Sequence, residues 1–202
     1  MKISQIELFQ VDLPYSGGVY LLSGGRSYTS FDASIVRITT DDGIQGWGES
    51  TPFGSTYIAS HALGTRAGIA EIAPHLINRD PRQVERINDA MDEALVGHNH
   101  AKTALDVACW DAFGKSVGLP VAELLGGSTG VPMSMISSIY AGKPEEMRQR
   151  VADHRAKGYR GHSIKIGALG AADARQRPQR GFQVPGGPPG AERVRFVRKL
   201  PS

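Results

Sequence analysis

The stretch from Ala101 to Gly127 reads AKTALDVACWDAFGKSVGLPVAELLGG and decides how the rest of the chain is interpreted. Small and apolar residues recur in it at helical spacing, which predicts a helix with one closely packed face: Ala101, Ala104, Leu105, Ala108, Cys109 and Ala112. Gly118 and Pro120 predict the end of this helix, because glycine adopts the left-handed cap conformation and proline cannot continue the hydrogen-bond ladder. The period alone indicates a buried helix with a glycine stop.

The order of residues in this stretch is more specific than its period. The pattern A-x-x-A-L-D-x-A-x-W-D-x-x-G-K-x-x-G-x-P-x-x-x-L-L-G resembles the signature helix of the mandelate racemase and muconate lactonizing enzyme family, within the enolase superfamily. The resemblance implies an α+β N-terminal cap domain followed by a modified TIM barrel. It says little about the reaction, because this helix is scaffold in the family and carries no catalytic group.

The composition is that of an ordinary globular protein. Of the 202 residues, 40% are hydrophobic and 21% are charged, which is enough apolar material for a core. No run approaches the about 20 apolar residues of a membrane span, and residues 1–13 alternate like a strand instead of resembling a signal peptide. The single cysteine, Cys109, excludes an internal disulfide and favours a reducing cytoplasm. Its place on the apolar stripe predicts a core residue and not a nucleophile.

The net charge of +3 is unevenly distributed along the chain. Residues 169–202 carry a net charge of +5, so the remaining residues carry −2. The basic residues therefore belong to a tail that lacks a folded basic face with interleaved aromatic residues. We expect no specific binding to nucleic acid and no association with membranes.

The residues before the signature helix predict a sheet followed by helices. Strands are expected at 2–13, 31–40 and 44–49, and the hairpin turn Asp41-Asp42-Gly43 joins the last two into a three-stranded antiparallel sheet. Loops are expected at 15–30 and 50–57, and helices at 58–76 and 81–94. Asp80 is the predicted N-cap of the second helix, with Pro81 at its first position. Sheet first and helices second is the pattern of an α+β domain.

After Gly130 the pattern changes to strand, helix, strand, at 131–141, 143–157 and 162–167. Such βαβ units build parallel sheets, and the resemblance implies the start of an incomplete TIM barrel here. We divide the chain into a cap domain (1–127), a first βαβ unit (128–168) and a tail (169–202). The tail holds five Gly, five Pro and seven basic residues without an amphipathic period. Two hypotheses fit it, a disordered segment and a frameshift.

The second predicted barrel strand ends with a motif that the resemblance connects to chemistry. In the family this strand ends in Lys-x-Lys, and the second lysine removes a proton next to a carboxylate. This chain has Ser163-Ile164-Lys165, which keeps the second lysine and has serine in place of the first. Alternation puts Ser163 and Lys165 on one face of the strand. We expect Lys165 to be the catalytic base; without the family match, a solvated lysine is the more natural interpretation. The serine leaves open which subgroup's chemistry applies.

The resemblance also implies a metal ion. An enolate formed next to a carboxylate needs concentrated positive charge, and enolase-superfamily sites supply it with one or two Mg²⁺ ions. Family members hold Mg²⁺ with carboxylates from the third, fourth and fifth barrel strands, which this chain lacks. Asp173 and Glu192 are poor substitutes, because Mg²⁺ demands several oxygens in octahedral geometry. We expect Mg²⁺ for the full-length family and no complete metal site on this chain.

Two loops are expected to shape the substrate pocket. In the family, the loop after the first strand and the loop after the hairpin close over the barrel mouth. The expected pocket residues on these loops and on the strand end are Tyr15, Tyr20, Thr51, Phe53, Tyr57 and Ser163. For any single loop residue, ordinary surface packing is an equally good interpretation. This combination of small polar and aromatic residues, with Ser163 at the first motif position, is most similar to family members that act on hydroxyproline or proline betaine, cis-3-hydroxy-L-proline dehydratases in particular.

Two functions from different classes follow from these observations. The first is a Mg²⁺-dependent dehydratase or racemase acting on a small carboxylate or amino acid, of which this chain is an N-terminal part that is inactive alone. The alternative is a non-catalytic cap domain that binds a partner. Two parallel strands leave an apolar edge unpaired, so we also expect homo-oligomers or aggregation.

Overall fold

The structure is a computed structural model that describes residues 1–22, 26–54, 57–166 and 195–196. The chain divides into two compact units. Unit 1 comprises Met1–Pro14 and Ser30–Gly130, and unit 2 comprises Tyr15–Thr29 and Val131–Ser202. The loop after the first strand therefore belongs with the C-terminal residues, although it lies early in the sequence.

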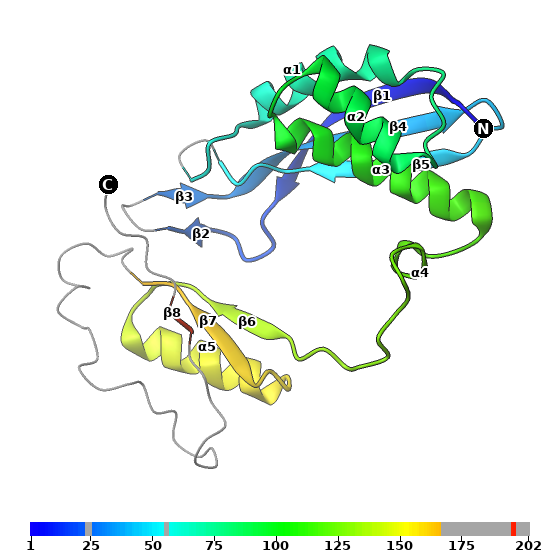
Figure 1. Cartoon of the computed structure of the whole chain (residues 1–202). Coiled ribbons are helices and arrows are strands. Elements are labelled where there is room, and N and C mark those ends of the chain that lie inside the picture. The colour runs from blue at the N-terminus through cyan, green and yellow to red at the C-terminus, as the bar shows by residue number, and fades with distance from the viewer. Residues whose placement is uncertain (23–25, 55–56, 167–194, 197–202) are drawn as a thin grey trace. The chain divides into compact units, whose positions relative to one another are not determined.

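Unit 1 contains the predicted three-stranded antiparallel sheet (Figure 1). Its strands are β1 (Ile3–Pro14), β4 (Ser30–Thr40) and β5 (Gln45–Ser50), in the order β1-β4-β5. The turn between β4 and β5 places Gly43 at φ 85°, a backbone conformation that glycine adopts without steric cost. The α+β pattern read from the sequence is confirmed here.

Helices cover one face of this sheet (Figure 1). They are α1 (Ala62–Ile72), followed by the 3-10 turn η2 (Ala73–Leu76), then α2 (Val84–Ala94) and α3 (Asn99–Val117). The short α4 (Val121–Leu124) follows α3 and contacts that helix. Helix α3 is the signature helix, and Gly118 ends it at φ 69° as predicted. The core between sheet and helices includes Val36, Ile38, Ile69, Ile87, Leu105 and Cys109. Cys109 is fully buried and is therefore a core residue, as expected. Its burial raises the pKa of the thiol to about 12.

Two glycines let α3 lie directly on β5. A Cβ atom at Gly46 would meet the carbonyl of Ala108, and one at Gly48 would meet the carbonyl of Ala104. The small residues predicted on α3 therefore pack against two positions of β5 that have no side chain. Close contact between strand and helix needs glycine on one side and alanine on the other.

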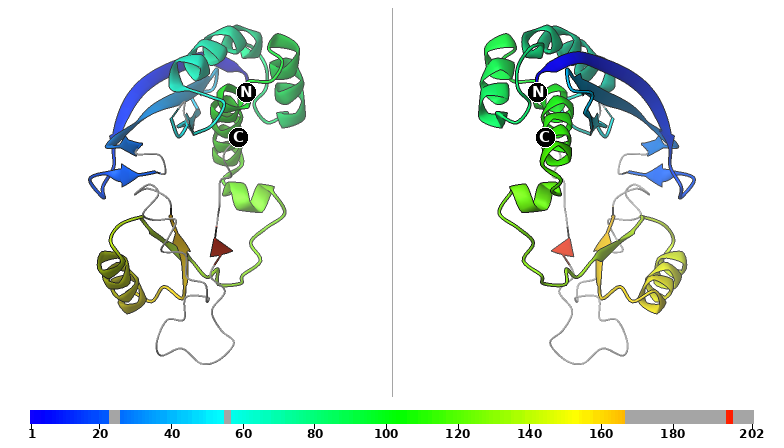
Figure 2. Two further views of the ribbon diagram at one scale, coloured as in Figure 1. Left: turned by 90° about the vertical axis from the view of Figure 1, so that its left-hand side faces the viewer. Right: turned by 90° about the vertical axis from the view of Figure 1, so that its right-hand side faces the viewer.

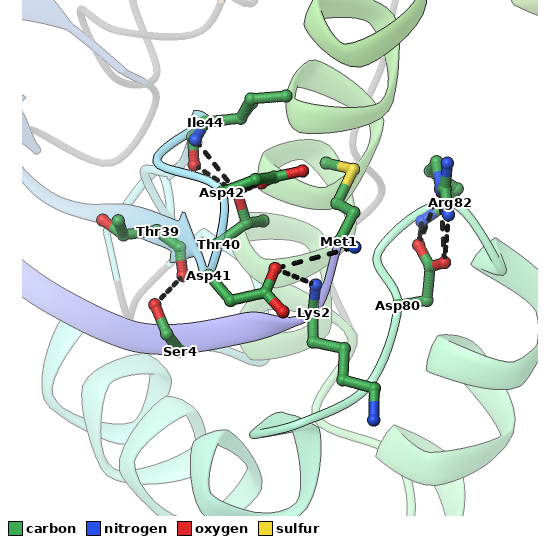
Figure 3. Close-up of polar contacts among 10 residues, drawn as sticks. All are labelled: Met1, Lys2, Ser4, Thr39, Thr40, Asp41, Asp42, Ile44, Asp80 and Arg82. Carbon is green, nitrogen blue, oxygen red and sulfur yellow. Dashed lines mark hydrogen bonds and ion pairs between the residues drawn. The ribbon is translucent and has the colours of Figure 1, made fainter.

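The predicted start of α2 is wrong. The helix begins at Val84, its N-cap residue is Gln83, and no side chain caps it. Asp80 instead accepts hydrogen bonds from the backbone N–H of Arg82 at 3.0 Å and from the Arg82 guanidinium at 2.7 Å (Figure 3). The carboxylate thus closes a local turn, which competes with capping. The predicted helix at 58–76 also begins later, at Ala62, where the His61 side chain caps it through the N–H of Gly64.

The chain start is fixed next to the hairpin turn of the sheet. Asp41 accepts a hydrogen bond from the backbone N–H of Lys2 at 2.7 Å, and the α-ammonium of Met1 lies 3.6 Å from the same carboxylate (Figure 3). The hydrogen bond from Lys2 is the main cause that lowers the pKa of Asp41. The turn between β4 and β5 therefore also anchors the beginning of β1.

Unit 2 contains a parallel pair of strands with a helix on one face (Figure 2). Its elements are β6 (Ile136–Ile139), α5 (Pro144–Ala156) and β7 (Gly161–Ile164). Strand β6 is shorter than the predicted strand at 131–141, because residues 131–135 are exposed and form no strand. The predicted loop at 15–30 also contains a small antiparallel hairpin of β2 (Tyr20–Leu21) and β3 (Ser27–Tyr28).

Most of the predicted tail at 169–202 lies outside the described residues. Within it, β8 (Arg195–Phe196) pairs with β7 in parallel. Part of the predicted loop at 50–57 also lies outside the description. In the described ranges, no helix has both the length and the apolar character that crossing a bilayer requires.

Candidate active site

Lys165 lies at the carboxyl end of β7, beside the end of β6. The two strands pair in the register Ser138↔Ser163 and Ile139↔Ile164. The backbone N–H of Lys165 donates to the carbonyl of Ile139 at 2.8 Å, which continues the parallel ladder beyond the last paired residues. The next residues in this register are therefore Tyr140 and Lys165. Carboxyl ends of parallel strands are where enzymes of the α/β barrel class place their reactive groups.

The two faces of the parallel pair differ in burial. Ser137 and Ile139 are buried, while Ile136 and Ser138 are exposed. On the buried face the Ser137 hydroxyl and His162 Nδ1 lie 2.6 Å apart and form a hydrogen bond between the strands. Because side chains alternate along a strand, Ser163 and Lys165 fall on the opposite face, as predicted from their spacing.

Three tyrosines meet at this end of the strands. We call Tyr15, Tyr20 and Tyr140 the tyrosine cluster. Their rings contact one another edge to face, with centroids 5.3 Å apart for Tyr15 and Tyr20, 6.0 Å for Tyr15 and Tyr140, and 5.7 Å for Tyr20 and Tyr140. Such geometry is the favourable one for aromatic pairs. The structure thus brings the predicted pocket residues Tyr15 and Tyr20 together with Tyr140, which was not predicted.

The tyrosine cluster is also linked through polar groups. The hydroxyls of Tyr15 and Tyr140 form a hydrogen bond. The Arg150 guanidinium of α5 lies over the Tyr140 ring, 5.1 Å from its centroid. Burial and then the hydrogen bond with Tyr140 raise the pKa of Tyr15 above its usual value. Tyr15 therefore remains a neutral phenol at physiological pH.

Sequence reasoning missed Tyr140. The signal that could have found it is its register, since it follows β6 at the position that corresponds to Lys165 after β7. The predicted strand ended at residue 141, two residues later than β6, which ends at Ile139. Tyr140 therefore appeared as one more strand residue and not as the first residue beyond the strand.

The other predicted pocket residues belong to unit 1. Phe53 stacks on Phe31 with ring centroids 4.9 Å apart, and Tyr57 meets Phe53 edge to face at 5.0 Å. The Thr51 hydroxyl donates to the Glu49 carboxylate at 2.5 Å. Phe53 and Tyr57 are thus brought together within unit 1, while Tyr15, Tyr20, Ser163 and Lys165 belong to unit 2.

The described residues do not provide a set of ligands for a divalent cation. Within 1–22, 26–54 and 57–166, no three His, Cys, Asp or Glu side chains gather closely enough to hold one ion. Asp173 and Glu192, which we weighed as ligands, lie outside the described residues. The arrangement at the strand ends consists of one amine, one serine hydroxyl and three phenols.

Both a family model and individual known proteins match this chain. The N-terminal domain of the mandelate racemase/muconate lactonizing enzyme family matches residues 24–126. The chain is 44% identical over 167 residues to cis-3-hydroxy-L-proline dehydratase from Roseibium aggregatum, a match that covers 83% of this chain and 46% of that protein. It is 32% identical over 167 residues to N-succinyl-L-Arg/Lys racemase from Bacillus cereus, covering 83% of this chain and 45% of that protein. The chain thus spans less than half the length of these relatives.

Solved structures also match most of this chain. A crystal structure from Roseovarius nubinhibens ISM, complexed with magnesium, has a TM-score of 0.79 at 56% identity and covers 83% of this chain and 45% of that one. A crystal structure from Aspergillus oryzae has a TM-score of 0.77 at 68% identity and covers 86% of this chain and 46% of that one. Both are described as mandelate racemase/muconate lactonizing enzymes.

Proposed function

Because the chain belongs to the mandelate racemase/muconate lactonizing enzyme family, we propose that it forms the N-terminal part of an enzyme that removes the proton α to a carboxylate. The observation that carries this proposal is the position of Lys165, held at the carboxyl end of β7 by the hydrogen bond between its backbone N–H and the Ile139 carbonyl. In this proposal residues 1–127 are the cap domain and 128–168 begin the barrel.

Lys165 is the base in the proposed reaction. Its uncharged amine takes the proton from the substrate Cα, and the electron pair left on Cα moves toward the carboxylate to form an enolate. In a dehydratase, the electron pair then expels the hydroxyl on the neighbouring carbon, and the departing oxygen takes up the proton that Lys165 removed, so that it leaves as water. In a racemase, Lys165 keeps that proton, and an acidic group on the opposite face delivers another proton to Cα. Both outcomes begin with the same step at Lys165.

The substrate pocket is the second part of the proposal. Tyr15 and Tyr20 bring aromatic surface and a phenolic hydroxyl to the strand ends, and Ser163 offers a hydroxyl on the same face as Lys165. Thr51, Phe53 and Tyr57 stay predicted substrate-binding residues that the family resemblance implies. A pocket of phenols and small hydroxyls suits a small amino acid with polar groups on its ring.

The enolate also needs positive charge for its stabilisation. A relative of known structure is complexed with magnesium, but the described residues of this chain hold no group of acidic or imidazole ligands that fits the ion. In the proposed enzyme, this chain supplies the base and part of the pocket.

The proposed substrate is a cyclic hydroxyamino acid. The 44% identity to cis-3-hydroxy-L-proline dehydratase supports a dehydration, and the 32% identity to N-succinyl-L-Arg/Lys racemase supports the second outcome, a racemisation. A cytoplasmic location remains a prediction from the single cysteine. The non-catalytic alternative predicts no turnover of either substrate, whether Lys165 is present or replaced.

A chimera tests this function, since the chain matches less than half of its relatives. Residues 1–166 of this chain replace the corresponding part of the Roseibium aggregatum dehydratase, and cis-3-hydroxy-L-proline and N-succinyl-L-arginine are compared as substrates. We expect dehydration of the hydroxyproline. A chimera that melts cooperatively like the parent enzyme but converts neither substrate would overturn the proposal.

A further inference from the structure

We propose that Tyr140 is a positioning residue for the substrate, because it fixes the ring of Tyr15 at the strand ends beside Lys165. This inference rests on the proposed function and deepens it, since it assigns a substrate-binding role to a residue that the motif around Lys165 does not include. Tyr140 acts through Tyr15 and takes no part in the proton transfer.

Tyr140 is held in place by two rigid elements. The residue before it, Ile139, is fully buried, and its carbonyl is tied to β7 through the N–H of Lys165. From α5, the Arg150 guanidinium lies over the Tyr140 ring. The positive guanidinium is attracted to the negative face of the aromatic ring. Tyr140 is therefore held both through its backbone neighbour on β6 and through its ring.

Tyr15 comes from the loop that follows β1, which also carries the β2–β3 hairpin. Its backbone N–H donates to the Thr29 carbonyl at 2.8 Å, and its carbonyl accepts from the N–H of Gly18 at 3.0 Å. The phenol of Tyr15 extends from this loop to Tyr140, whose hydroxyl it meets, and to the edge of the Tyr20 ring. The hydrogen bond between the two phenols thus links this loop to the residue that follows β6, next to Lys165 in the strand register.

Loss of the Tyr140 hydroxyl should affect substrate binding more than the proton transfer at Lys165. When the Tyr140 hydroxyl is removed, the Tyr15 phenol loses this hydrogen bond and keeps its ring contacts, while Lys165 keeps its backbone hydrogen bond to Ile139. One neutral hydrogen bond of net value about 1 kcal/mol corresponds to about a five-fold change in an equilibrium constant. Tyr140→Phe should therefore weaken substrate binding about five-fold and leave the turnover number within about two-fold.

The link between the two phenols can be tested on the 202-residue chain itself. Ultraviolet absorbance during an alkaline titration reports the ionisation of tyrosines, of which the chain has six. Tyr140→Phe should let Tyr15 ionise at lower pH, because it removes a hydrogen bond that raises the pKa of Tyr15. Tyr159→Phe is the matched control, since Tyr159 contacts His154 and lies outside the tyrosine cluster. If Tyr140→Phe and Tyr159→Phe give the same titration curve, each with the signal of one tyrosine fewer than the unchanged chain, the link is overturned.

The effect on the substrate is measured in the chimera. Calorimetry with cis-3-hydroxy-L-proline in a Lys165→Met background gives the dissociation constant without turnover, and Tyr140→Phe should raise it about five-fold. In the background with Lys165 intact, KM should rise by a similar factor with kcat preserved. Unchanged binding, or a loss of kcat at constant KM, would overturn the positioning role. If Lys165→Met leaves activity intact, the proposed function fails, while the calorimetry still decides the role of Tyr140.

Discussion

The Asp111 carboxylate of α3 accepts a hydrogen bond from the backbone N–H of Trp47 on β5, at 2.8 Å. Strand β5 is an edge of the sheet β1-β4-β5, so this N–H faces away from β4 and needs a partner outside the sheet. The Lys115 ammonium lies 2.6 Å from the same carboxylate and also donates to the Gln45 carbonyl at 2.9 Å. The acidic and basic residues of the signature helix thus complete the hydrogen bonding of an edge strand.

Replacement of this carboxylate should destabilise unit 1. Asp111→Ala leaves the Trp47 N–H and the Lys115 ammonium without their partner, and we expect a loss of about 1–2 kcal/mol in the free energy of unfolding, measured in urea. Amide exchange at Trp47 should accelerate. Asp111→Asn, which keeps one acceptor oxygen, serves as the control and should lose less. Equal stability of Asp111→Ala and the unchanged chain would contradict this account.

The contact between β5 and α3 predicts that alanine is not tolerated at Gly46. Its Cβ would collide with the Ala108 carbonyl, which belongs to the helix backbone and cannot turn away. We expect Gly46→Ala to cost about 3 kcal/mol, at the upper end of the range for overpacked cores. Gln45→Ala, at an exposed neighbouring position, is the control and should stay within about 0.5 kcal/mol. Similar melting temperatures for the two variants would mean that the sheet and the helix are not in close contact.

An ion pair between β4 and α1 predicts a pH dependence. The Arg66 guanidinium binds the Asp32 carboxylate through two hydrogen bonds, of 2.7 and 3.0 Å. The hydrogen bond from Arg66 is the main cause that lowers the pKa of Asp32 below its usual 3.8. A lowered carboxyl pKa stabilises the fold above that usual value, and the stabilisation is lost as the pH falls through the lowered pKa. The pair is therefore expected to contribute at pH 7 and not in strong acid.

Arg66→Met measures this contribution. Because the Asp32 side chain is 39% exposed, water screens the pair, and we expect a loss of about 1 kcal/mol at pH 7. The difference from the unchanged chain should shrink in urea titrations as the pH falls below 3.8 and vanish once it is below the lowered pKa of Asp32. Arg86→Met, an exposed arginine on α2, is the control. A difference that persists unchanged in acid would show that packing and not charge accounts for it.

Unit 2 predicts self-association. Its exposed apolar side chains lie before and on β6 and after β7: Val131, Met133, Met135, Ile136 and Ile166. Apolar surface next to an open parallel strand favours association between copies. We expect oligomers of the 202-residue chain in analytical ultracentrifugation, and a larger monomer fraction for Ile136→Lys. A chain that sediments as a monomer at every concentration would contradict this prediction.

Much of unit 1 could be predicted from local patterns. Alternation gave β1, β4 and β5, and the helix at Asn99–Val117 followed from its small residues and its glycine stop. The start of α2 could not be predicted, because Asp80 has two local uses, a cap or a turn with Arg82, and propensity does not choose between them. The role of Gly46 and Gly48 also escaped the sequence, since a strand glycine acquires meaning only from what packs on it.

The candidate site was predicted less completely than the fold. Lys165 and Ser163 came from a motif together with the strand period, and their roles stay predictions. Tyr140 depends on where β6 ends relative to β7, a register between strands that lie more than twenty residues apart. Short-range periodicity carries no information on that register. Pocket residues on loops are the hardest class to predict, because their neighbours come from distant parts of the chain.

The most direct test of the central claim is hydrogen exchange at the substrate Cα. The chimera carrying residues 1–166 of this chain is incubated with L-proline in D₂O, and proton NMR follows the loss of the Cα signal. L-Proline has no 3-hydroxyl to expel, so exchange reports proton removal alone. If Lys165 is the base, exchange proceeds in the chimera, stops in Lys165→Met and continues in the control Lys157→Met, whose lysine is exposed at the end of α5. Exchange that is equally fast in Lys165→Met would contradict the account.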